Sequence, residues 1–172
     1  MIRKATLGDI RYAAEIYDKI HENEAKKAVS IGWVKGVYPT IKTAENALKR
    51  GDLFVFEDDG RILASAIINK TQVDVYENGN WLYFAPDEKI MVLHTLTVDP
   101  DEGKRGIGRA FVEFYESYAK ENGCSVLRMD TNEINFVARR FYEKFGFREA
   151  GIVPCEFNGI PGVNLVLLEK RI

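Results

Sequence analysis

The stretch that decides the fold is HTLTVDPDEGKRGIGRAF, residues 94–111. It begins as a β-strand, passes through a glycine-rich turn and continues as an amphipathic helix. This order gathers backbone N–H groups and the positive end of a helix dipole at one point, an arrangement that binds phosphate anions. Gly106 and Gly108 carry no Cβ that would hold a ligand away from the backbone. Three cationic residues surround the turn: Lys104, Arg105 and Arg109. The stretch therefore predicts a ligand that carries phosphate.

Two common phosphate-binding motifs do not fit this turn. A P-loop ends in Gly-Lys-Ser/Thr, whereas Gly108 is followed by Arg109 and Ala110. A dinucleotide fingerprint needs a small residue where Phe111 stands, and a first βαβ unit near the start of the chain. A Gly-x-Gly turn taken alone is also compatible with a helix start that binds nothing.

A second motif lies on a helix expected at residues 134–145. Asn135, Ala138 and Tyr142 are spaced i, i+3 and i+7, which places them on one face of that helix. The apolar face that we expect to pack on the sheet is made of Phe136, Val137 and Phe141. A helix with such a face does not need the Asn–Ala–Tyr stripe for its stability. The stripe therefore indicates a ligand surface, and the alternative is a solvated flank with an incidental tyrosine.

Composition fits one domain over residues 1–172, 46% hydrophobic and 29% charged. The net charge of −2 argues against a nucleic-acid surface. No apolar run approaches membrane-spanning length and no signal peptide is expected, so we expect no membrane partner. The two cysteines, Cys124 and Cys155, lack metal-ligand spacing. They predict a reducing, cytoplasmic setting and no metal site.

Hydrophobic periodicity and turn residues predict an α/β domain with a mixed sheet. Helices are expected at about residues 10–27, 40–50, 107–123 and 134–145. Strands are expected at about residues 2–6, 53–57, 61–69, 90–98, 124–129, 147–153 and 163–169, with a turn at 159–162 between the last two. Residues 70–89 are expected to form either an irregular excursion or a strand with a loop, and long excursions of this kind are often functional.

Together, the two motifs resemble those of the GNAT superfamily of acyl-CoA-dependent N-acyltransferases. The motif-bearing match covers about residues 92–147, with GKRGIGRA at 103–110 and NFVARRFYEKFGF at 135–147. One departure is Gly103, which stands where the family pattern has Gln or Arg. The family binds pyrophosphate mainly through backbone N–H groups, so we expect the site to survive this change. The resemblance implies a mixed, mostly antiparallel central sheet, splayed at its middle and flanked by about four helices.

The resemblance also implies acetyl-CoA as co-substrate. The central-strand residues that would meet the pantetheine arm are Leu96, Thr97 and Val98, and the Val98 N–H would polarise the thioester carbonyl. The residues that would hold the pyrophosphate are Lys104, Arg105, Gly106, Ile107, Gly108 and Arg109. Asn135 would contact the arm from the later helix, beside the small Ala138.

Two residues are candidates for proton transfer. Tyr142 matches the family's usual general acid, which protonates the departing thiolate; its rival role is only to position the sulfur. Residues 93–96, Leu-His-Thr-Leu, resemble the corresponding strand of arylalkylamine N-acetyltransferases, where a histidine is implicated in deprotonating the amine. His94 is therefore a candidate base, and its alternative is a buried histidine satisfied by a backbone carbonyl. Other carboxylates near the expected cleft are Asp130, Glu133 and Glu156.

The expected reaction is direct attack of a primary amine, on a small molecule or a peptide, on acetyl-CoA. The alternatives are a non-catalytic acyl-CoA-binding or sensor module, and a nucleotide-binding protein unrelated to acylation. Dimers are frequent in families of this kind, so a homodimer is one expected assembly. Acceptor choice is expected from residues 25–38, 81–84 and 156–163. The candidate walls of an acceptor pocket are Trp33, Tyr38 and Trp81, and the alternative, which is commoner for large aromatics, is packing in the protein interior.

Overall fold

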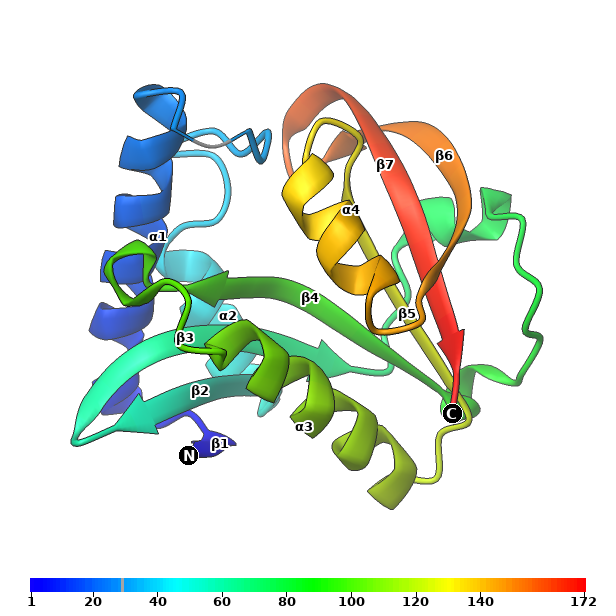
Figure 1. The fold of residues 1–172 in the computed structure, drawn as a ribbon, viewed down its shortest axis with the longest axis horizontal. Helices are drawn as coiled ribbons and strands as arrows, with labels where there is room; N and C mark the ends of the chain where they lie inside the picture. The colour runs from blue at the N-terminus through cyan, green and yellow to red at the C-terminus, as the bar shows by residue number, and fades with distance from the viewer. Residues whose placement is uncertain (29) are drawn as a thin grey trace.

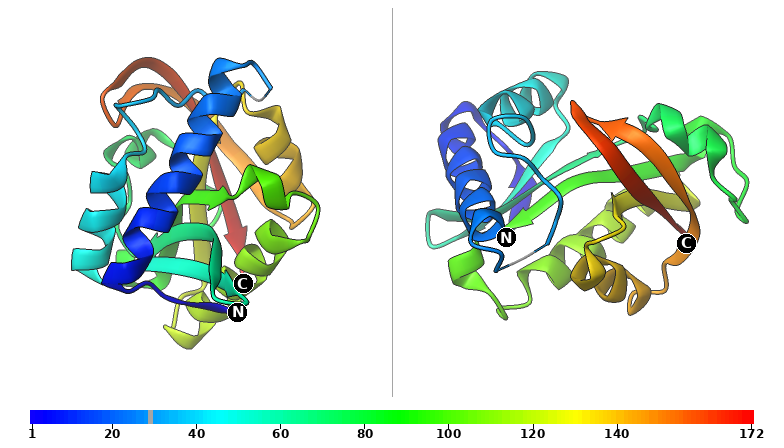
Figure 2. Two further views of the ribbon diagram at one scale, coloured as in Figure 1. Left: turned by 90° about the vertical axis from the view of Figure 1, so that its left-hand side faces the viewer. Right: turned by 90° about the horizontal axis from the view of Figure 1, so that it is seen from above.

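The computed structural model describes residues 1–28 and 30–172, which form one seven-stranded sheet with helices on both faces (Figures 1 and 2). In chain order the strands are β1 (Ile2–Lys4), β2 (Leu53–Asp58), β3 (Arg61–Asn69), β4 (Ile90–Val98), β5 (Val126–Asn132), β6 (Arg148–Phe157) and β7 (Ile160–Arg171). The α-helices of the described residues are α1 (Ile10–Ala25), α2 (Ile41–Arg50), α3 (Ile107–Glu121) and α4 (Phe136–Glu143).

The strands lie in the order β1-β2-β3-β4-β5-β7-β6. Every neighbouring pair is antiparallel except β4 and β5, which run parallel. The predicted mixed, mostly antiparallel sheet with helices around it is confirmed. Helices α1 and α2 cover one face, and α3 and α4 lie on the other, as the view from above in Figure 2 shows.

The parallel pairing of β4 and β5 is short, and this opens the sheet at its middle. It runs from Ile90 opposite Val126 to Leu93 opposite Met129, although both strands continue beyond those residues. The register between β3 and β4 shifts just there, and Thr95 has a φ of +50°. A β-branched residue rarely adopts this conformation. The bulge bends β4 away from β5, so the sheet splays where the resemblance implied that it would.

Two-residue turns close both long hairpins. Asp59 and Gly60 join β2 to β3, and Asn158 and Gly159 join β6 to β7; all four have positive φ, as type I′ turns require. The predicted turn at residues 159–162 is therefore wrong. Asn-Gly is itself sufficient for a tight hairpin, so the last two strands are longer than predicted and residues 160–162 belong to β7.

The apolar face predicted for α4 is only partly correct. Phe136 and Val137 are 61% and 82% exposed, whereas Ala138, Phe141 and Tyr142 pack against the main core. Phe141 is partly buried and packs against α3, where a Cβ on Gly108 would lie 3.4 Å from its ring. The Asn–Ala–Tyr stripe, not the Phe–Val pair, faces the interior of the protein.

Residues 70–89 form an irregular segment that covers the β5–β7–β6 part of the sheet. It contains two short 3₁₀ helices, Asp74–Asn78 and Asp87–Lys89. The Trp81 ring stacks under the Arg128 guanidinium at 3.9 Å, and the buried Glu169 carboxylate accepts hydrogen bonds from the backbone of Leu82 and Tyr83. These contacts with Arg128 and Glu169 hold the segment against the sheet.

Candidate active site

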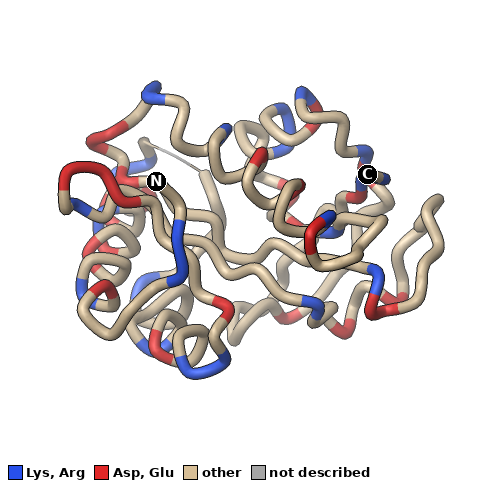
Figure 3. Tube along the Cα trace, turned by 90° about the horizontal axis from the view of Figure 1, so that it is seen from below, with Lys and Arg blue, Asp and Glu red and all other residues tan. Residues whose placement is uncertain are grey.

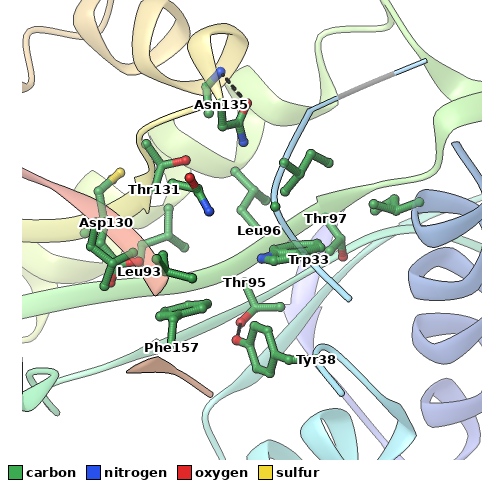
Figure 4. Close-up of a pocket in the computed structure, with 18 of the residues that line it drawn as sticks. Trp33, Tyr38, Leu93, Thr95, Leu96, Thr97, Asp130, Thr131, Asn135 and Phe157 are labelled. Carbon is green, nitrogen blue, oxygen red and sulfur yellow. Dashed lines mark hydrogen bonds between the residues drawn. The ribbon is translucent and has the colours of Figure 1, made fainter. Parts of the chain in front are cut away.

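The opening between β4 and β5 forms a cavity of about 310 Å³, drawn in Figure 4. It is lined by both strands, by α4 and by the segment that follows α1. Six of the predicted site residues line it: Leu96, Thr97, Val98, Asn135, Ala138 and Tyr142. The structure therefore brings the strand residues that precede the glycine turn and the Asn–Ala–Tyr stripe to one opening, whereas none of the predicted residues 104–109 lines it. We call it the strand cavity.

A second cavity of about 680 Å³ lies next to α2. It is lined by α2, by the end of β3 and the residues that follow it, and by the end of β6. We call it the α2 cavity. The residues that line both cavities are Tyr38, Thr95, Asp130 and Phe157, and we call this group the junction. Figure 4 labels all four residues and shows Tyr38, Thr95 and Phe157 close together, as the Tyr38–Thr95 hydrogen bond and the edge contact of Tyr38 with Phe157 require.

The junction carries one carboxylate with altered acidity. Asp130 lies in β5, one residue beyond the last pair with β4, and its Oδ2 accepts a hydrogen bond of 2.7 Å from the Tyr76 hydroxyl. Burial raises the pKa of Asp130 to about 6, and the Tyr76 hydrogen bond opposes this rise. Asp130 is therefore mostly ionised at neutral pH and still able to accept a proton. Across the junction, the hydroxyl groups of Tyr38 and Thr95 are hydrogen-bonded to each other.

His94 lines the α2 cavity and does not belong to the junction. Its Nε2 lies 3.1 Å from both Asn69 Oδ1 and the Thr71 carbonyl oxygen, so Nε2 carries the proton. Burial lowers the pKa of His94 to about 4. This arrangement resembles the alternative of a buried histidine held by a backbone carbonyl, and such an imidazole is a weak base at neutral pH.

Tyr142 is buried at the wall of the strand cavity, in edge contact with Phe141 and Phe147. Burial, together with the negative charge of Asp130, raises the pKa of its phenol. The hydroxyl therefore keeps its proton throughout the neutral range. Such a group can donate a proton to a strongly basic acceptor in the cavity, as a general acid does.

The glycine turn presents backbone amides at the start of α3. Gly106, with a φ of +75°, precedes the helix, and the amides of residues 103–109 find no hydrogen-bond acceptor within the described part of the chain. Gly106 has open space on its Cβ side. Lys104 also has a positive φ, of 69°. The cluster of free N–H groups fits a diphosphate.

The side chains around this turn contribute less charge than their number suggests. Arg105 is paired with Glu102 and Asp58, each at 2.6 Å, and Arg109 with Glu113 at 2.7 Å. Ile107 points into the core, so only its backbone can meet a ligand. The turn is tied to α1 through Lys19, whose ammonium lies 2.8 Å from Asp99. The backbone N–H groups, rather than the side-chain charges, are therefore the donors that an anion at this turn would meet.

Two further polar groups face the strand cavity. The Asp99 N–H bonds to the Leu63 carbonyl on β3, and N–H groups alternate between the two edges of a strand, so the Val98 N–H points into the opening. Asn135 caps α4 through its Oδ1, which accepts from the Ala138 N–H at 3.1 Å, as the dashed line in Figure 4 marks. This cap leaves the Asn135 NH₂ group as a donor for a ligand.

Some predicted acceptor residues lie elsewhere. Trp33 and Tyr38 line the strand cavity, but Trp81 packs on Arg128 and lines neither cavity, so its predicted role as a wall is wrong. Glu156 is an exposed lining residue of the α2 cavity, whereas Glu133 accepts a hydrogen bond from Asn164 outside both cavities. Within the predicted range 25–38, position 29 lies outside the described residues.

Among the described residues, no group of three or more His, Cys, Asp or Glu side chains is arranged to hold a metal ion. None of the helices drawn in Figure 1 is both long and apolar enough to cross a bilayer. Cationic and anionic residues are interspersed along the chain, as Figure 3 shows.

Comparison with known proteins matches this architecture. The sequence pattern of the acetyltransferase (GNAT) family matches residues 17–147, more than half of the chain. An acetyltransferase of the GNAT family from Streptococcus agalactiae has the same fold, with a TM-score of 0.82 at 21% identity over 100% of this chain and 95% of that chain.

Two curated relatives align with part of the chain. An uncharacterized N-acetyltransferase of Methanocaldococcus jannaschii is 32% identical over 43% of this chain and 33% of its own length. The [ribosomal protein bS18]-alanine N-acetyltransferase of Escherichia coli is 32% identical over 44% of this chain and 53% of its own length. The chain thus aligns with about half, or less, of the length of these relatives. With the family pattern matched across both motifs and the splayed sheet, the chain belongs to the acetyltransferase (GNAT) family.

Proposed function

We propose that this protein transfers an acetyl group from acetyl-CoA to a primary amine. The observation that carries the proposal is the meeting of the two cavities at the junction, beside Asp130. One cavity has Tyr142 in its wall and is lined by Val98 and Pro100, which precede the glycine turn, and the other is lined by mixed polar and apolar side chains. An acceptor in the α2 cavity would reach the reacting group only through the junction.

The strand cavity would hold the coenzyme. The free amides of residues 103–109 would bind its pyrophosphate, and the edge of β4 from Leu96 to Val98 would pair with the pantetheine arm, with Asn135 on the other side. Acetyl-CoA supplies the activated acetyl group as a thioester. The Val98 N–H would donate to the carbonyl oxygen as negative charge develops there, which can lower a barrier by roughly 3 kcal/mol.

Two side chains would move the protons. An alkylammonium with a pKa of about 10 must lose a proton before it can attack. Asp130, ionised at neutral pH and placed at the junction, would accept that proton directly or through water. Tyr142 would donate its phenolic proton to the leaving sulfur. His94 would line the acceptor cavity as a neutral group, so Asp130 replaces it as the preferred base.

The acceptor would be a small amine or the amino terminus of a peptide. One relative carries the name of a ribosomal-protein alanine N-acetyltransferase and another that of N-acetylaspartate synthetase, so the family includes acceptors of both kinds. The α2 cavity offers hydroxyl, amide and charged groups from α2 and β6. We propose that this cavity selects the acceptor.

Ligand binding and turnover test the proposal in that order. In a thermal-shift assay, acetyl-CoA and coenzyme A at about 100 times Kd should stabilise the fold by roughly 2.7 kcal/mol. A shift with ATP alone would instead favour a nucleotide-binding protein. Free thiol release is then measured with a panel of tyramine, spermidine, glutamate and a peptide that begins with alanine. Binding of coenzyme A without thiol release from any panel member would favour a sensor module.

A variant pair tests the proposed base. Asp130→Asn should lower kcat/KM by about 100-fold, as loss of a general base commonly does. Asp74→Asn is the matched control, because Asp74 is exposed and lines neither cavity. Equal activity of the two variants would contradict the role of Asp130.

A further inference from the structure

The irregular segment 70–89 places one buried hydroxyl group, that of Tyr76, next to Asp130 of the candidate active site. Tyr76 is 2% exposed and lies in the first 3₁₀ helix of the segment. Its ring packs edge-on against Trp81, whose Nε1 donates to the Tyr76 carbonyl at 2.6 Å. Gly79 permits this packing, since a Cβ there would lie 2.5 Å from the Trp81 ring. The local fold therefore fixes the direction of the Tyr76 side chain.

Contacts to the sheet hold the segment in place from both sides. The Asn80 N–H bonds to the Ala150 carbonyl on β6, and Trp81 is stacked on Arg128 of β5. The buried Glu169 of β7 binds the backbone that follows. None of these groups lines either cavity. Their common effect is to hold the Tyr76 hydroxyl at 2.7 Å from Asp130 Oδ2.

We infer that Tyr76 is a positioning residue for the reaction. Its hydroxyl group fixes the orientation of the Asp130 carboxylate and stabilises the ionised form of that carboxylate. The inference rests on the proposed function, in which Asp130 is the base. The Tyr76 hydroxyl donates a hydrogen bond to Asp130 Oδ2, and no other donor among the described residues is hydrogen-bonded to Asp130. Asp130 Oδ1 is therefore available to the amine substrate. Tyr76 lines neither cavity and would not touch the substrate.

The hydrogen bond has a defined electrostatic effect. A hydroxyl that donates to a carboxylate stabilises the ionised form, and here it opposes the burial that raises the pKa of Asp130. Other titratable or charged groups also face Asp130 or line the α2 cavity with it: Tyr38, Lys42, Arg50, His94, Tyr142, Cys155 and Glu156. Among the described residues, Tyr76 is the one that donates a direct hydrogen bond to Asp130. Removal of the Tyr76 hydroxyl should therefore raise the pKa of Asp130.

The test compares Tyr76→Phe with Tyr115→Phe. Both remove one hydroxyl from a fully buried tyrosine, but the Tyr115 hydroxyl donates to the carbonyl groups of Met91 and Arg128. The first readout is the ¹³C NMR titration of the Asp130 carboxyl group in the free enzyme, assigned by its loss in Asp130→Asn. The second is the acidic limb of kcat/KM against pH, measured with acetyl-CoA and the panel amine of highest turnover.

In Tyr76→Phe we expect both the carboxyl titration and the acidic limb to move up by about one pH unit, as loss of a hydrogen bond to a charged group implies. Tyr115→Phe should lower thermal stability and leave both titrations unchanged. An unmoved carboxyl titration in Tyr76→Phe would overturn the inference. A moved carboxyl titration with an unmoved rate limb would support the coupling of Tyr76 to Asp130 and contradict Asp130 as the base.

Discussion

Leu93 and Met129 are the last residues through which β4 and β5 pair, and the site opens directly beyond them. Thr95 follows Leu93 by two positions, and Asp130 follows Met129 by one; both belong to the junction. A continuous parallel ladder would occupy the edges of both strands with hydrogen bonds. Its early end leaves the edge of β4 free for a ligand and exposes the Asp130 side chain to two cavities.

The phenol of Tyr142 provides the first prediction. Tyr142→Phe keeps the packing against Phe141 and Phe147 but removes the proton donor, so kcat should fall by about 100-fold. The Kd for acetyl-CoA, measured by calorimetry, should change little. Tyr118→Phe, which removes a hydroxyl from a ring stacked on Phe114, is the control and should retain activity. A Tyr142→Phe enzyme of normal kcat would leave Tyr142 with a positioning role at most.

The backbone at Gly106 provides the second prediction. Gly106→Ala places a Cβ on a residue with a φ of +75° and adds bulk where the diphosphate would bind. Gly60→Ala imposes the same strain at a φ of +74°, also in open space, on the β2–β3 turn. Both variants should lose about 1 kcal/mol of stability. Only Gly106→Ala should bind acetyl-CoA more weakly, by about tenfold in calorimetry; equal affinities would argue against the proposed diphosphate site.

The acidity of His94 provides the third prediction. Folding lowers its pKa from 6.5 to about 4, so the unfolded chain binds this proton more tightly than the folded protein. Its contribution to stability is therefore full above pH 6.5 and is lost as the pH falls through 4. Chemical denaturation between pH 7 and pH 4 should show a smaller loss of stability in His94→Gln than in the wild type. The acidic limb of kcat/KM near pH 6 should persist in this variant, and its disappearance would restore His94 as the base.

The acidity of Asp130 provides a fourth prediction, of opposite sign. Folding raises its pKa from 3.8 to about 6, so its contribution to stability is full below pH 3.8 and is lost as the pH rises through 6. Asparagine does not ionise and can still accept the Tyr76 hydrogen bond. Asp130→Asn should therefore be more stable than the wild type at pH 7.5, by about 3 kcal/mol, and similar to it at pH 4. A less stable variant at pH 7.5 would show that burial does not penalise this carboxylate.

Local features of the chain were predictable because short-range physics sets them. The strand, glycine turn and helix between His94 and Phe111 follow from hydrophobic periodicity and from a glycine that tolerates positive φ. Asp59-Gly60 predicted its hairpin for the same reason. The free amides at the start of α3 arise in any helix, whose first N–H groups have no partner within the helix. These local elements suffice for the resemblance to the family.

Features that depend on distant contacts were not predictable in this way. Sequence spacing alone could not show that Phe136 and Val137 are exposed while Tyr142 is buried, because the elements that pack on α4 decide which face is covered. The same limit applied to the charges at the turn: Arg105 is paired with Asp58, which lies 47 residues away in the chain.

The amino-acid sequence by itself determined the order of the elements, the glycine turn before α3 and the stripe that contains Asn135 and Tyr142, since each depends on neighbours within a few residues. The tertiary structure alone decided that Asp130 stands where two cavities meet and that Tyr76, 54 residues earlier, donates to it. The acidity of a carboxylate depends on burial and on the groups brought beside it, and only the folded chain brings those groups together.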